Sequence, residues 1–359
     1  MKHIIITLKD ITESGGGERV GANLANALSA NGYKVTIISL FSLNKKPVYD
    51  IDKNISIQIL SNITPTTKNP LQKLFCKSLY RSYLGRKIDE MIKELKPSVV
   101  LANDGWYIPR QRAQNVRYVR LWHLKFPKNM NNRKRANLSR FDTLILLSHR
   151  ELPKWQAHHK NIKVIPNFLP TLPTISTDSS QKVVLSVGRL SEEKGFLRLI
   201  DIWEMIKQSK DSQGWQLVIV GDGELKGQIE SKIHAKKLQD SIILKPFTKD
   251  IESEYMKASI YVMTSHFEGF PMVLIEACAY GLCPVSFDIQ TGPSDIIESS
   301  ASGYLIEDND LKNFATKTLE LMNDESRRKA LGANAKERVK AHFSKESILP
   351  LWEEVLYAK

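Results

Sequence analysis

Two glutamates, Glu268 and Glu276, are separated by seven residues that contain a Gly-Phe-Pro turn. The apolar run at 260–263 before them is typical of a buried strand, and residues 273–279 after the turn have the alanine and leucine content of a helix. Glu268 is therefore expected on the loop after a strand, and Glu276 about two turns into the helix. In an open α/β sheet, ligands bind beyond the carboxyl ends of the strands, where the N–H groups of a helix start attract anions. The segment predicts a ligand site at such an edge.

A second segment places two cations after another apolar run, at 183–187. Arg189 and Lys194 are five residues apart, with Gly188 before them and Gly195 after them. Cations at the end of a strand are suited to bind a diphosphate and to stabilise charge that grows on it during a reaction. The alternative interpretation is a pair of solvated charges on a loop between a strand and a helix.

These segments resemble motifs of glycosyltransferase family 4, a family of retaining enzymes with the two-domain GT-B fold, in particular its bacterial members that build surface polysaccharides. Residues 188–194 resemble the G-R-x4-K diphosphate clamp, residues 220–225 resemble the next strand-turn-helix junction, and residues 268–276 resemble the E-x7-E motif. The three occur in the order and approximate spacing of the family. The resemblance is strongest over residues 183–343. Before residue 180 it rests on a glycine-rich first loop, one histidine and the Pro166-Asn167 turn.

The resemblance implies an enzyme that moves a hexose or an N-acetylhexosamine from a nucleotide sugar, expected to be UDP-linked, to a lipid-linked or surface-polysaccharide acceptor such as lipopolysaccharide or capsule. It implies retention by front-face displacement, in which the leaving phosphate helps to deprotonate the acceptor hydroxyl. The nucleotide sugar is then a substrate, and neither a metal ion nor a cofactor is expected.

The resemblance also assigns roles to individual residues. Arg189 and Lys194 would hold the diphosphate, Glu268 would contact the transferring sugar, and Glu276 would accept hydrogen bonds from the ribose hydroxyls. His123, after the apolar run at 118–121, would lie near the primary hydroxyl of the sugar and the acceptor; a purely structural histidine is the alternative. Further substrate-binding positions are expected at Gly16, Gly17, Asp104, Gly188, Phe247, Thr248, Gly269, Phe270, Pro271, Met272 and Val273.

The elements that would position these residues form two βα series. Strands are predicted at 4–8, 35–40, 98–102, 118–121 and 143–147, with a helix at 20–28. After a Pro/Ser/Thr-rich linker at 166–181, further strands are predicted at 183–187, 217–220, 242–244, 260–263 and 283–287. The expected fold is α/β, with two doubly wound Rossmann-like domains facing a central cleft. Residues 1–170 would form the acceptor-side domain and 171–346 the nucleotide-sugar domain, and the family resemblance implies that a helix at 347–357 packs back on the first.

The first glycine-rich loop differs from a dinucleotide-binding fingerprint. A G-x-G-x-x-G pattern that begins at Gly15 would need a third glycine where Val20 stands. Residues 40–43, after the second strand, contain no acidic side chain to bind a ribose. An NAD-binding domain is therefore not expected, and Gly16 and Gly17 would instead let the backbone approach a phosphate or an acceptor.

The charge of the chain is unevenly distributed. Residues 1–170 contain 29 Lys and Arg against 11 Asp and Glu, a net charge of +18, and the remaining residues contain 23 against 28, a net charge of −5. A basic amphipathic helix is predicted at 68–95, with Lys73, Lys77 and Arg81 on one face. We expect an anionic membrane surface as a partner, although a helix packed on its own domain with a solvated basic face is equally consistent.

Other features limit the alternatives. No signal peptide and no run of about 18 apolar residues is evident, so a cytoplasmic enzyme is expected. If it associates with a membrane, it is expected to bind peripherally to the inner face of the cytoplasmic membrane. A nucleic-acid-binding protein would also be basic, but no recognised motif of that class is present, and nucleic acid is not expected as a partner. A sugar-nucleotide epimerase of GT-B shape is the enzymatic alternative.

Overall fold

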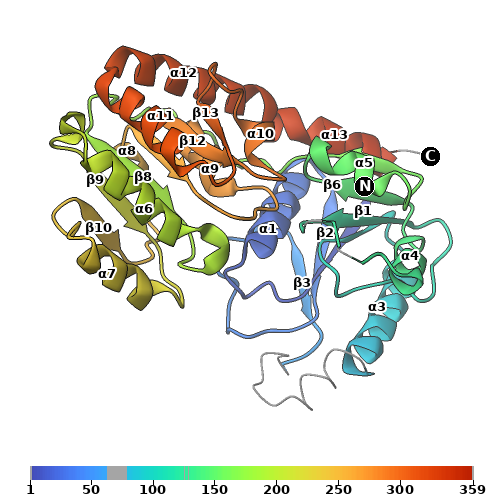
Figure 1. The fold of residues 1–359 in the computed structure, drawn as a ribbon. Coiled ribbons are helices and arrows are strands. Elements are labelled where there is room, and N and C mark those ends of the chain that lie inside the picture. The colour runs from blue at the N-terminus through green and yellow to red at the C-terminus, as the bar shows by residue number, and fades with distance from the viewer. Residues whose placement is uncertain (1, 63–78, 125, 128, 358–359) are drawn as a thin grey trace. The chain divides into compact units, whose positions relative to one another are not determined.

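The computed structural model describes residues 2–62, 79–124, 126–127 and 129–357. The chain divides into two compact α/β units, one formed by residues 1–170 and 348–359 and the other by residues 171–347 (Figure 1). The change of unit after Pro170 falls in the Pro/Ser/Thr-rich segment, which is typical of a domain linker.

Unit 1 contains a parallel sheet in the order β3-β2-β1-β4-β5-β6-β7. The strands are β1 (His3–Leu8), β2 (Lys34–Ser39), β3 (Ser56–Ile59), β4 (Val99–Ala102), β5 (Arg117–Trp122), β6 (Thr143–Leu146) and β7 (Ile162–Val164). Ile4, Ile5 and Ile6 of β1 are fully buried, because a central parallel strand is covered on both faces. This burial explains the continuous apolar run by which the strand is recognised in the sequence.

The helices of unit 1 include one from the far end of the chain. They are α1 (Gly16–Ala30), α3 (Arg81–Leu95), α4 (Asn132–Leu138), α5 (Leu152–Trp155) and the last helix, α13 (Lys345–Tyr357). From Ile348 onward, α13 belongs to unit 1 and buries Trp352 there. The backbone carbonyls of Leu356 and Val355, at the end of α13, accept hydrogen bonds from Lys2 and Arg117. Cations at a helix C-terminus are favoured by the helix dipole.

Unit 2 contains a parallel sheet in the order β10-β9-β8-β11-β12-β13. Its strands are β8 (Val183–Val187), β9 (Gln216–Val220), β10 (Ile242–Lys245), β11 (Ile260–Met263), β12 (Cys283–Asp288) and β13 (Tyr304–Glu307). Its helices are α6 (Phe196–Lys207), α7 (Lys226–Ala235), α8 (Glu252–Met256), α9 (Met272–Ala279), α10 (Pro293–Ile296), α11 (Leu311–Asn323) and α12 (Glu325–His342). Apolar side chains of α6, α11 and the strands form one core, in which Phe287 and Phe314 pack with ring centroids 4.7 Å apart.

In both sheets the strand order reverses between two neighbouring strands. In unit 1, the strands that follow β1 in the chain are added on one side of it, and those that follow β4 are added on the other side. In unit 2 the same reversal falls between β8 and β11. Loops that leave the carboxyl ends of two such strands run to opposite sides and leave a crevice between them. Each unit therefore has one topological switch point, which is the expected place for a ligand.

Several predicted boundaries differ from the observed ones. The last helix begins at Lys345 rather than 347, because Ser344 is followed by a turn in which its hydroxyl accepts a hydrogen bond from the backbone N–H of Ser347. The predicted helix at 68–95 is observed as α3 from Arg81 onward, and its first part lies outside the described residues up to 78. Strands β3, β7 and β13 were not predicted, because they are short sheet-edge or partly exposed segments without an apolar run.

Candidate active site

The loops that carry the unit 2 motifs leave the two strands of the switch point. Gly188, Arg189 and Lys194 follow β8, and Glu268 follows β11, its neighbour in the sheet. Gly195 makes the close approach of these loops possible: its φ is +67°, and a Cβ there would lie 2.0 Å from the carbonyl oxygen of Thr264. The sheet therefore brings together residues that are 69 to 74 positions apart in the sequence, Gly195 with Thr264 and Lys194 with Glu268.

Glu268 is the centre of a buried polar cluster. Its side chain is 8% exposed, and Lys194 Nζ lies 2.7 Å from Oε1 and 2.8 Å from Oε2. Ser265 donates a second hydrogen bond to Oε1, at 2.6 Å, and Thr291 donates one to the backbone carbonyl of Glu268. Both carboxylate oxygens are thus held, while an ammonium group has three donors, so Lys194 can still donate to a further acceptor.

Glu276 is placed deeper, as the fifth residue of α9, a little over one turn from its start rather than two. It is 6% exposed, and Tyr255 donates a hydrogen bond of 2.9 Å to its Oε2. Burial, followed by the negative charges of Glu268 and Glu276, raises the pKa of Tyr261 on β11 well above its ordinary value. The two carboxylates therefore act on the same phenol.

The turn between the two glutamates is rigidly packed. Gly269 to Val273 run from the loop into α9, with Pro271 as the residue before the first helical turn. Phe270 is buried against Phe343, and the φ of Gly292 is +99°, which lets its backbone approach Pro271. The backbone N–H groups at this helix start are expected to remain available to an anion.

The other expected positions of unit 2 are at its surface. Arg189 is exposed and, within the described part of the chain, its guanidinium makes no hydrogen bond or ion pair, while its backbone carbonyl accepts from the N–H of Ser191. Phe247, after β10, is 64% exposed, and its backbone N–H donates to Asp222, whereas Thr248 accepts a hydrogen bond from the backbone of Asp250. An exposed aromatic ring at the carboxyl edge of a parallel sheet is suited to stack against a base.

The expected positions of unit 1 also lie at the carboxyl edge of its sheet. Gly16 and Gly17 are the first residues of α1, and no atom lies within 4 Å of a Cβ built on either of them, so there is open space beside this backbone. Asp104, after β4, accepts hydrogen bonds from the backbone N–H groups of Lys9 and Trp106. Its two oxygens therefore join the loops after β1 and β4, a structural contact that sequence reasoning did not foresee.

His123 lies after β5, next to the same edge. Its Nε2 is 3.1 Å from Oδ1 of Asn103, the residue that follows β4. Burial, and then the positive charge of Arg120, lower the pKa of His123 to about 4, against the opposing effect of the backbone of Asn103. The ring is therefore neutral at physiological pH and can serve as a hydrogen-bonding group rather than as a charge.

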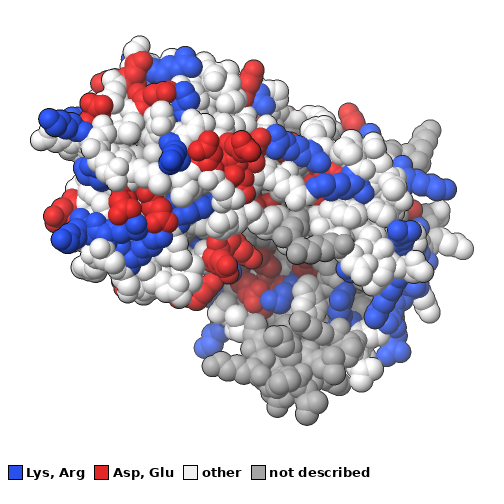
Figure 2. Space-filling model, viewed as in Figure 1, with Lys and Arg blue, Asp and Glu red and all other residues white. Residues whose placement is uncertain are grey.

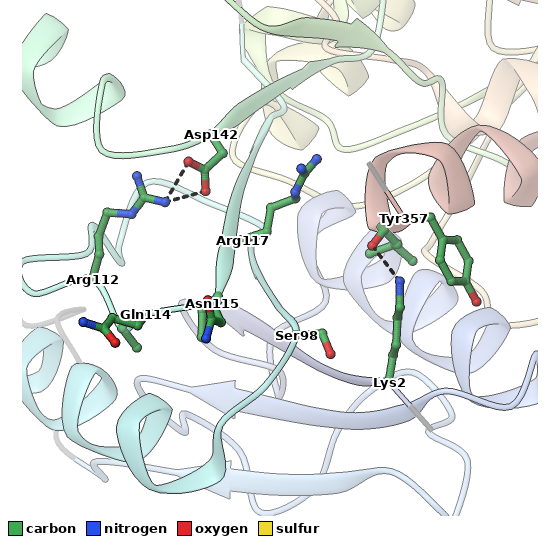
Figure 3. A pocket seen from close by; sticks show the side chains of 11 residues that line it. Lys2, Ser98, Arg112, Gln114, Asn115, Arg117, Asp142 and Tyr357 are labelled. Carbon is green, nitrogen blue, oxygen red and sulfur yellow. Dashed lines mark hydrogen bonds and ion pairs between the residues drawn. The ribbon is translucent and has the colours of Figure 1, made fainter. Parts of the chain in front are cut away.

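An open pocket of unit 1 lies at the opposite edge of the sheet. Its volume is about 640 Å³, and Ser98, Arg117 and Asp142, which precede or begin β4, β5 and β6, contribute to its wall (Figure 3). The cations that line it are already engaged. Arg112 is paired with Asp142 at 2.6 Å, and Lys2 and Arg117 bind the last carbonyls of α13. This pocket is therefore part of the docking of α13 and not of the site.

Sequence reasoning missed the residues that hold the site in place. These are Asn103, Arg198, Tyr255, Ser265 and Thr291. Arg198 donates to the carbonyl oxygens of Thr264 and Ser265 and also pairs with Asp308 at 2.7 Å. No local pattern distinguishes these side chains from ordinary polar residues, because, apart from the Ser265–Glu268 pair three residues apart, their partners are 20 or more positions away in the sequence.

Among the described residues, no group of three or more His, Cys, Asp or Glu side chains could hold a metal ion. None of the helices in that part of the chain combines the length and apolar character needed to cross a bilayer.

Comparison with known proteins agrees with this geometry. The chain matches the family model described as "Glycosyl transferases group 1" over residues 173–338 and the one described as "Glycosyltransferase Family 4" over residues 14–171. It is 30% identical over 369 residues to the amylovoran biosynthesis glycosyltransferase AmsD of Erwinia amylovora, with 99% of this chain and 100% of AmsD covered. It is 29% identical over 371 residues to an uncharacterized glycosyltransferase of Haemophilus influenzae, with 99% and 100% covered.

A solved structure shows the same fold. A mutant of S. aureus TarM in complex with fondaparinux, alpha-GlcNAc-glycerol and UDP superimposes with a TM-score of 0.78 at 17% identity, over 100% of both chains. Two parallel α/β units, each with a switch point, together with the family matches, thus define a glycosyltransferase of the GT-B class. The chain belongs to glycosyltransferase family 4. The resemblance inferred from the three motifs and the expected GT-B fold of two doubly wound Rossmann-like units are both confirmed.

The lowered pKa of His123 predicts a pH dependence of stability. Between pH 6.5 and pH 4 the unfolded chain binds a proton at this residue that the folded chain does not, so the free energy of unfolding must fall as the pH falls. We expect the loss caused by His123 to be about 1 to 3 kcal/mol between pH 7 and pH 4. Urea unfolding at both pH values should therefore show a smaller loss for His123→Gln than for the parent.

His234→Gln is the matched control, because His234 is exposed on α7. This variant should keep the parent's pH dependence. An equal loss of stability in the parent and in His123→Gln would show that His123 is protonated as easily in the folded chain as in the unfolded one.

Proposed function

We propose that this glycosyltransferase is a retaining, metal-independent enzyme that transfers a hexose or an N-acetylhexosamine from a UDP-sugar to a lipid-linked or surface-polysaccharide acceptor. The proposal draws on the relatives for its substrates: AmsD is named for amylovoran biosynthesis, and TarM was solved with UDP. It requires no resident cofactor, because the nucleotide sugar is itself a substrate.

The observation that carries the proposal is the Lys194–Glu268 pair at the switch point of unit 2. Lys194 donates hydrogen bonds to the carboxylate and, with three N–H donors in its ammonium group, can also donate to a diphosphate oxygen. With Arg189 exposed beside it and the N–H groups at the start of α9, the loops provide positive charge where the departing nucleoside diphosphate becomes more negative. Interactions that strengthen as the bond breaks stabilise the transition state more than the ground state.

The same pair argues against a covalent intermediate on Glu268. Lys194 and Ser265 donate hydrogen bonds to Oε1 and Oε2 of Glu268, and these bonds stabilise the negative charge and so reduce the nucleophilicity of the carboxylate. In the proposed step the acceptor oxygen forms the new bond to the anomeric carbon on the face from which the phosphate oxygen departs. The acceptor proton passes to that phosphate, so the configuration is retained.

Glu276 is proposed to bind the ribose. Tyr255 donates to its Oε2 and fixes the orientation of the carboxylate, and a carboxylate has further lone pairs that can accept from ribose hydroxyls. Phe247 would stack against the uracil, and Thr248 would lie beside it. In unit 1, Gly16, Gly17 and His123 are proposed to face the sugar and its acceptor.

The direct test is incubation of the full chain with UDP-sugars and a polyprenyl-diphosphate glycan, in the presence and absence of EDTA. We expect one UDP-sugar to yield a glycoside with the anomeric configuration of the donor, at a rate that EDTA leaves unchanged. An inverted product, dependence on added metal, or an epimerised UDP-sugar would each overturn part of the proposal.

Replacement of Lys194 tests the clamp. Lys194→Ala should lower kcat about a hundredfold or more, equivalent to roughly 3 kcal/mol of transition-state stabilisation. It also leaves the buried Glu268 without its cation, so thermal melting should show some loss of stability. Steady-state kinetics at a temperature well below melting separate the two effects.

Lys232→Ala is the matched control. The side chain of Lys232, on α7, is 26% exposed, as is that of Lys194, and its Nζ lies 2.6 Å from Asp201 on α6. It should melt slightly earlier than the parent and retain full turnover. A Lys194→Ala enzyme that works within about threefold of the parent would exclude the clamp.

The two glutamates should differ in their effect on nucleotide binding. Glu276→Gln should weaken UDP binding by about 1.5 to 3 kcal/mol, roughly 10- to 150-fold in Kd, because a charged acceptor for the ribose hydroxyls is lost. Glu268→Gln should leave the Kd for UDP nearly unchanged and reduce transfer. Calorimetry and turnover measurements distinguish them, with Glu254→Gln on α8, a mostly buried glutamate paired with Lys245, as control. Equal weakening of UDP binding by both substitutions would refute the division of roles.

We also propose that unit 1 binds the inner face of the cytoplasmic membrane, which would bring the enzyme to a lipid-linked acceptor. On the face shown in Figure 2, Lys and Arg side chains gather at the right, where Figure 1 has α3 and α4. These helices carry Arg86, Lys87, Lys93, Arg133, Lys134 and Arg135. Arg81 was expected on the basic face of the predicted helix at 68–95. Its guanidinium instead donates to the backbone carbonyls of Gly105 and Trp106.

Lys73 and Lys77, which lie outside the described residues, are the positions to change in a test of membrane binding. Changing both to Gln should weaken binding to phosphatidylglycerol vesicles by about 1 kcal/mol per charge, and added salt should weaken the parent in the same way. Exposed Lys329 and Lys340 on α12 of unit 2, changed together to Gln, form the control. Binding that is equal for neutral and acidic vesicles would exclude an electrostatic membrane surface.

A further inference from the structure

Asn103 joins three elements at the carboxyl edge of the unit 1 sheet. It follows the last residue of β4 and is only 2% exposed. Its Nδ2 donates to the backbone carbonyl of Gly17 in the first turn of α1, at 2.9 Å, and its Oδ1 lies 3.1 Å from Nε2 of His123 after β5. Gly21 leaves room for this side chain, since a Cβ at that position would lie 3.2 Å from Nδ2.

The partners of Asn103 fix the orientation of its amide. The carbonyl of Gly17 can only accept a hydrogen bond, so the amide nitrogen must face it. The amide oxygen then faces His123, and this oxygen can also only accept. Nε2 of His123 must therefore carry a proton. In a neutral imidazole with a proton on Nε2, the other nitrogen, Nδ1, has a free lone pair.

Within the described ranges, the one hydrogen bond of the His123 ring is that of Nε2 to Asn103, so Nδ1 has no partner there, and the side chain is partly exposed. The charged group that faces the ring is Arg120 on β5, whose positive charge opposes protonation of the imidazole. The neutral ring thus presents an acceptor at the sheet edge.

We propose that Asn103 is a positioning residue that fixes His123 in the tautomer protonated on Nε2, so that Nδ1 accepts a hydrogen bond from a hydroxyl group of the sugar substrate. The identity of this ligand rests on the proposed glycosyl transfer, whereas the tautomer is a property of the chain alone. A hydroxyl group that donates to Nδ1 has its oxygen lone pairs oriented away from the ring. Selection of one tautomer therefore selects the orientation of the bound sugar.

The tautomer can be measured directly in the substrate-free protein. Long-range 1H–15N NMR spectra of the full chain with labelled histidines distinguish a protonated ring nitrogen from an unprotonated one, and His123→Gln identifies the signals of His123. At pH 7 we expect Nε2 to be protonated and Nδ1 unprotonated. A proton on Nδ1, or equal averaging of the two nitrogens, would overturn the proposal without bearing on whether the enzyme transfers sugar.

Two substitutions then test the role of Asn103. Asn103→Leu removes the acceptor, so both 15N shifts should move toward averaged values and kcat should fall about tenfold or more, while the Kd for UDP stays within about twofold. Asn103→Asp retains an oxygen that accepts from Nε2, so it should keep the tautomer and raise the pKa of the ring. Asn103→Leu with unchanged 15N shifts, or Asn103→Asp with the tautomer lost, would contradict the assignment.

Asn161→Leu is the matched control. Asn161 also donates hydrogen bonds within unit 1, to Asp142 and Thr143, but it precedes β7 and so lies at the amino edge of the sheet. This variant should lose some stability and leave both the 15N shifts of His123 and kcat unchanged. Equal changes in Asn103→Leu and Asn161→Leu would show that Asn103 only supports the fold.

Discussion

The burial of the Glu268 carboxylate determines the construction of unit 2 around its switch point. A buried carboxylate without partners costs several kcal/mol, and it is retained here because Lys194 and Ser265 bind both oxygens. Lys194 reaches Glu268 only because Gly195 lets the loop after β8 approach the backbone of Thr264. The ion pair, the glycine and the close approach of the loops therefore form one interdependent arrangement.

Arg198 supports this arrangement from the first turn of α6. Its guanidinium binds the carbonyls of Thr264 and Ser265, which are the last residues before the loop that carries Glu268. It also lies over the ring of Phe287 at 4.2 Å and is paired with Asp308. Without Arg198, the buried carbonyls that follow β11 would lack a hydrogen-bond donor, which costs free energy of folding. The buried arginine therefore helps to hold the loop that carries Glu268 in position.

The sequence predicted the parts of the structure whose signals are local. The limits of β8 and β11 were predicted to the residue, because central parallel strands are continuous apolar runs bounded by polar loops. The exposed strand β3 lacks such a run. In the site, spacing predicted Lys194, Glu268 and Glu276, but Tyr255 and Thr291 contact them only after the sheet has folded. Such contacts leave no periodic trace in one sequence.

The net charge of each half of the chain differs in sign from the groups that it presents at the carboxyl edge of its sheet, or is not matched by them. Residues 1–170 are strongly basic, yet the polar groups at the carboxyl edge of the unit 1 sheet include a neutral His123 and the amide of Asn103. Residues 171–359 are mildly acidic, yet the loops at their switch point present Arg189 and Lys194. Overall charge governs long-range attraction to surfaces, and it is screened beyond about 8–10 Å in physiological salt. Discrimination between a phosphate and a hydroxyl must come from groups within hydrogen-bond distance, so the sheet edges and not the charge totals decide what each unit binds.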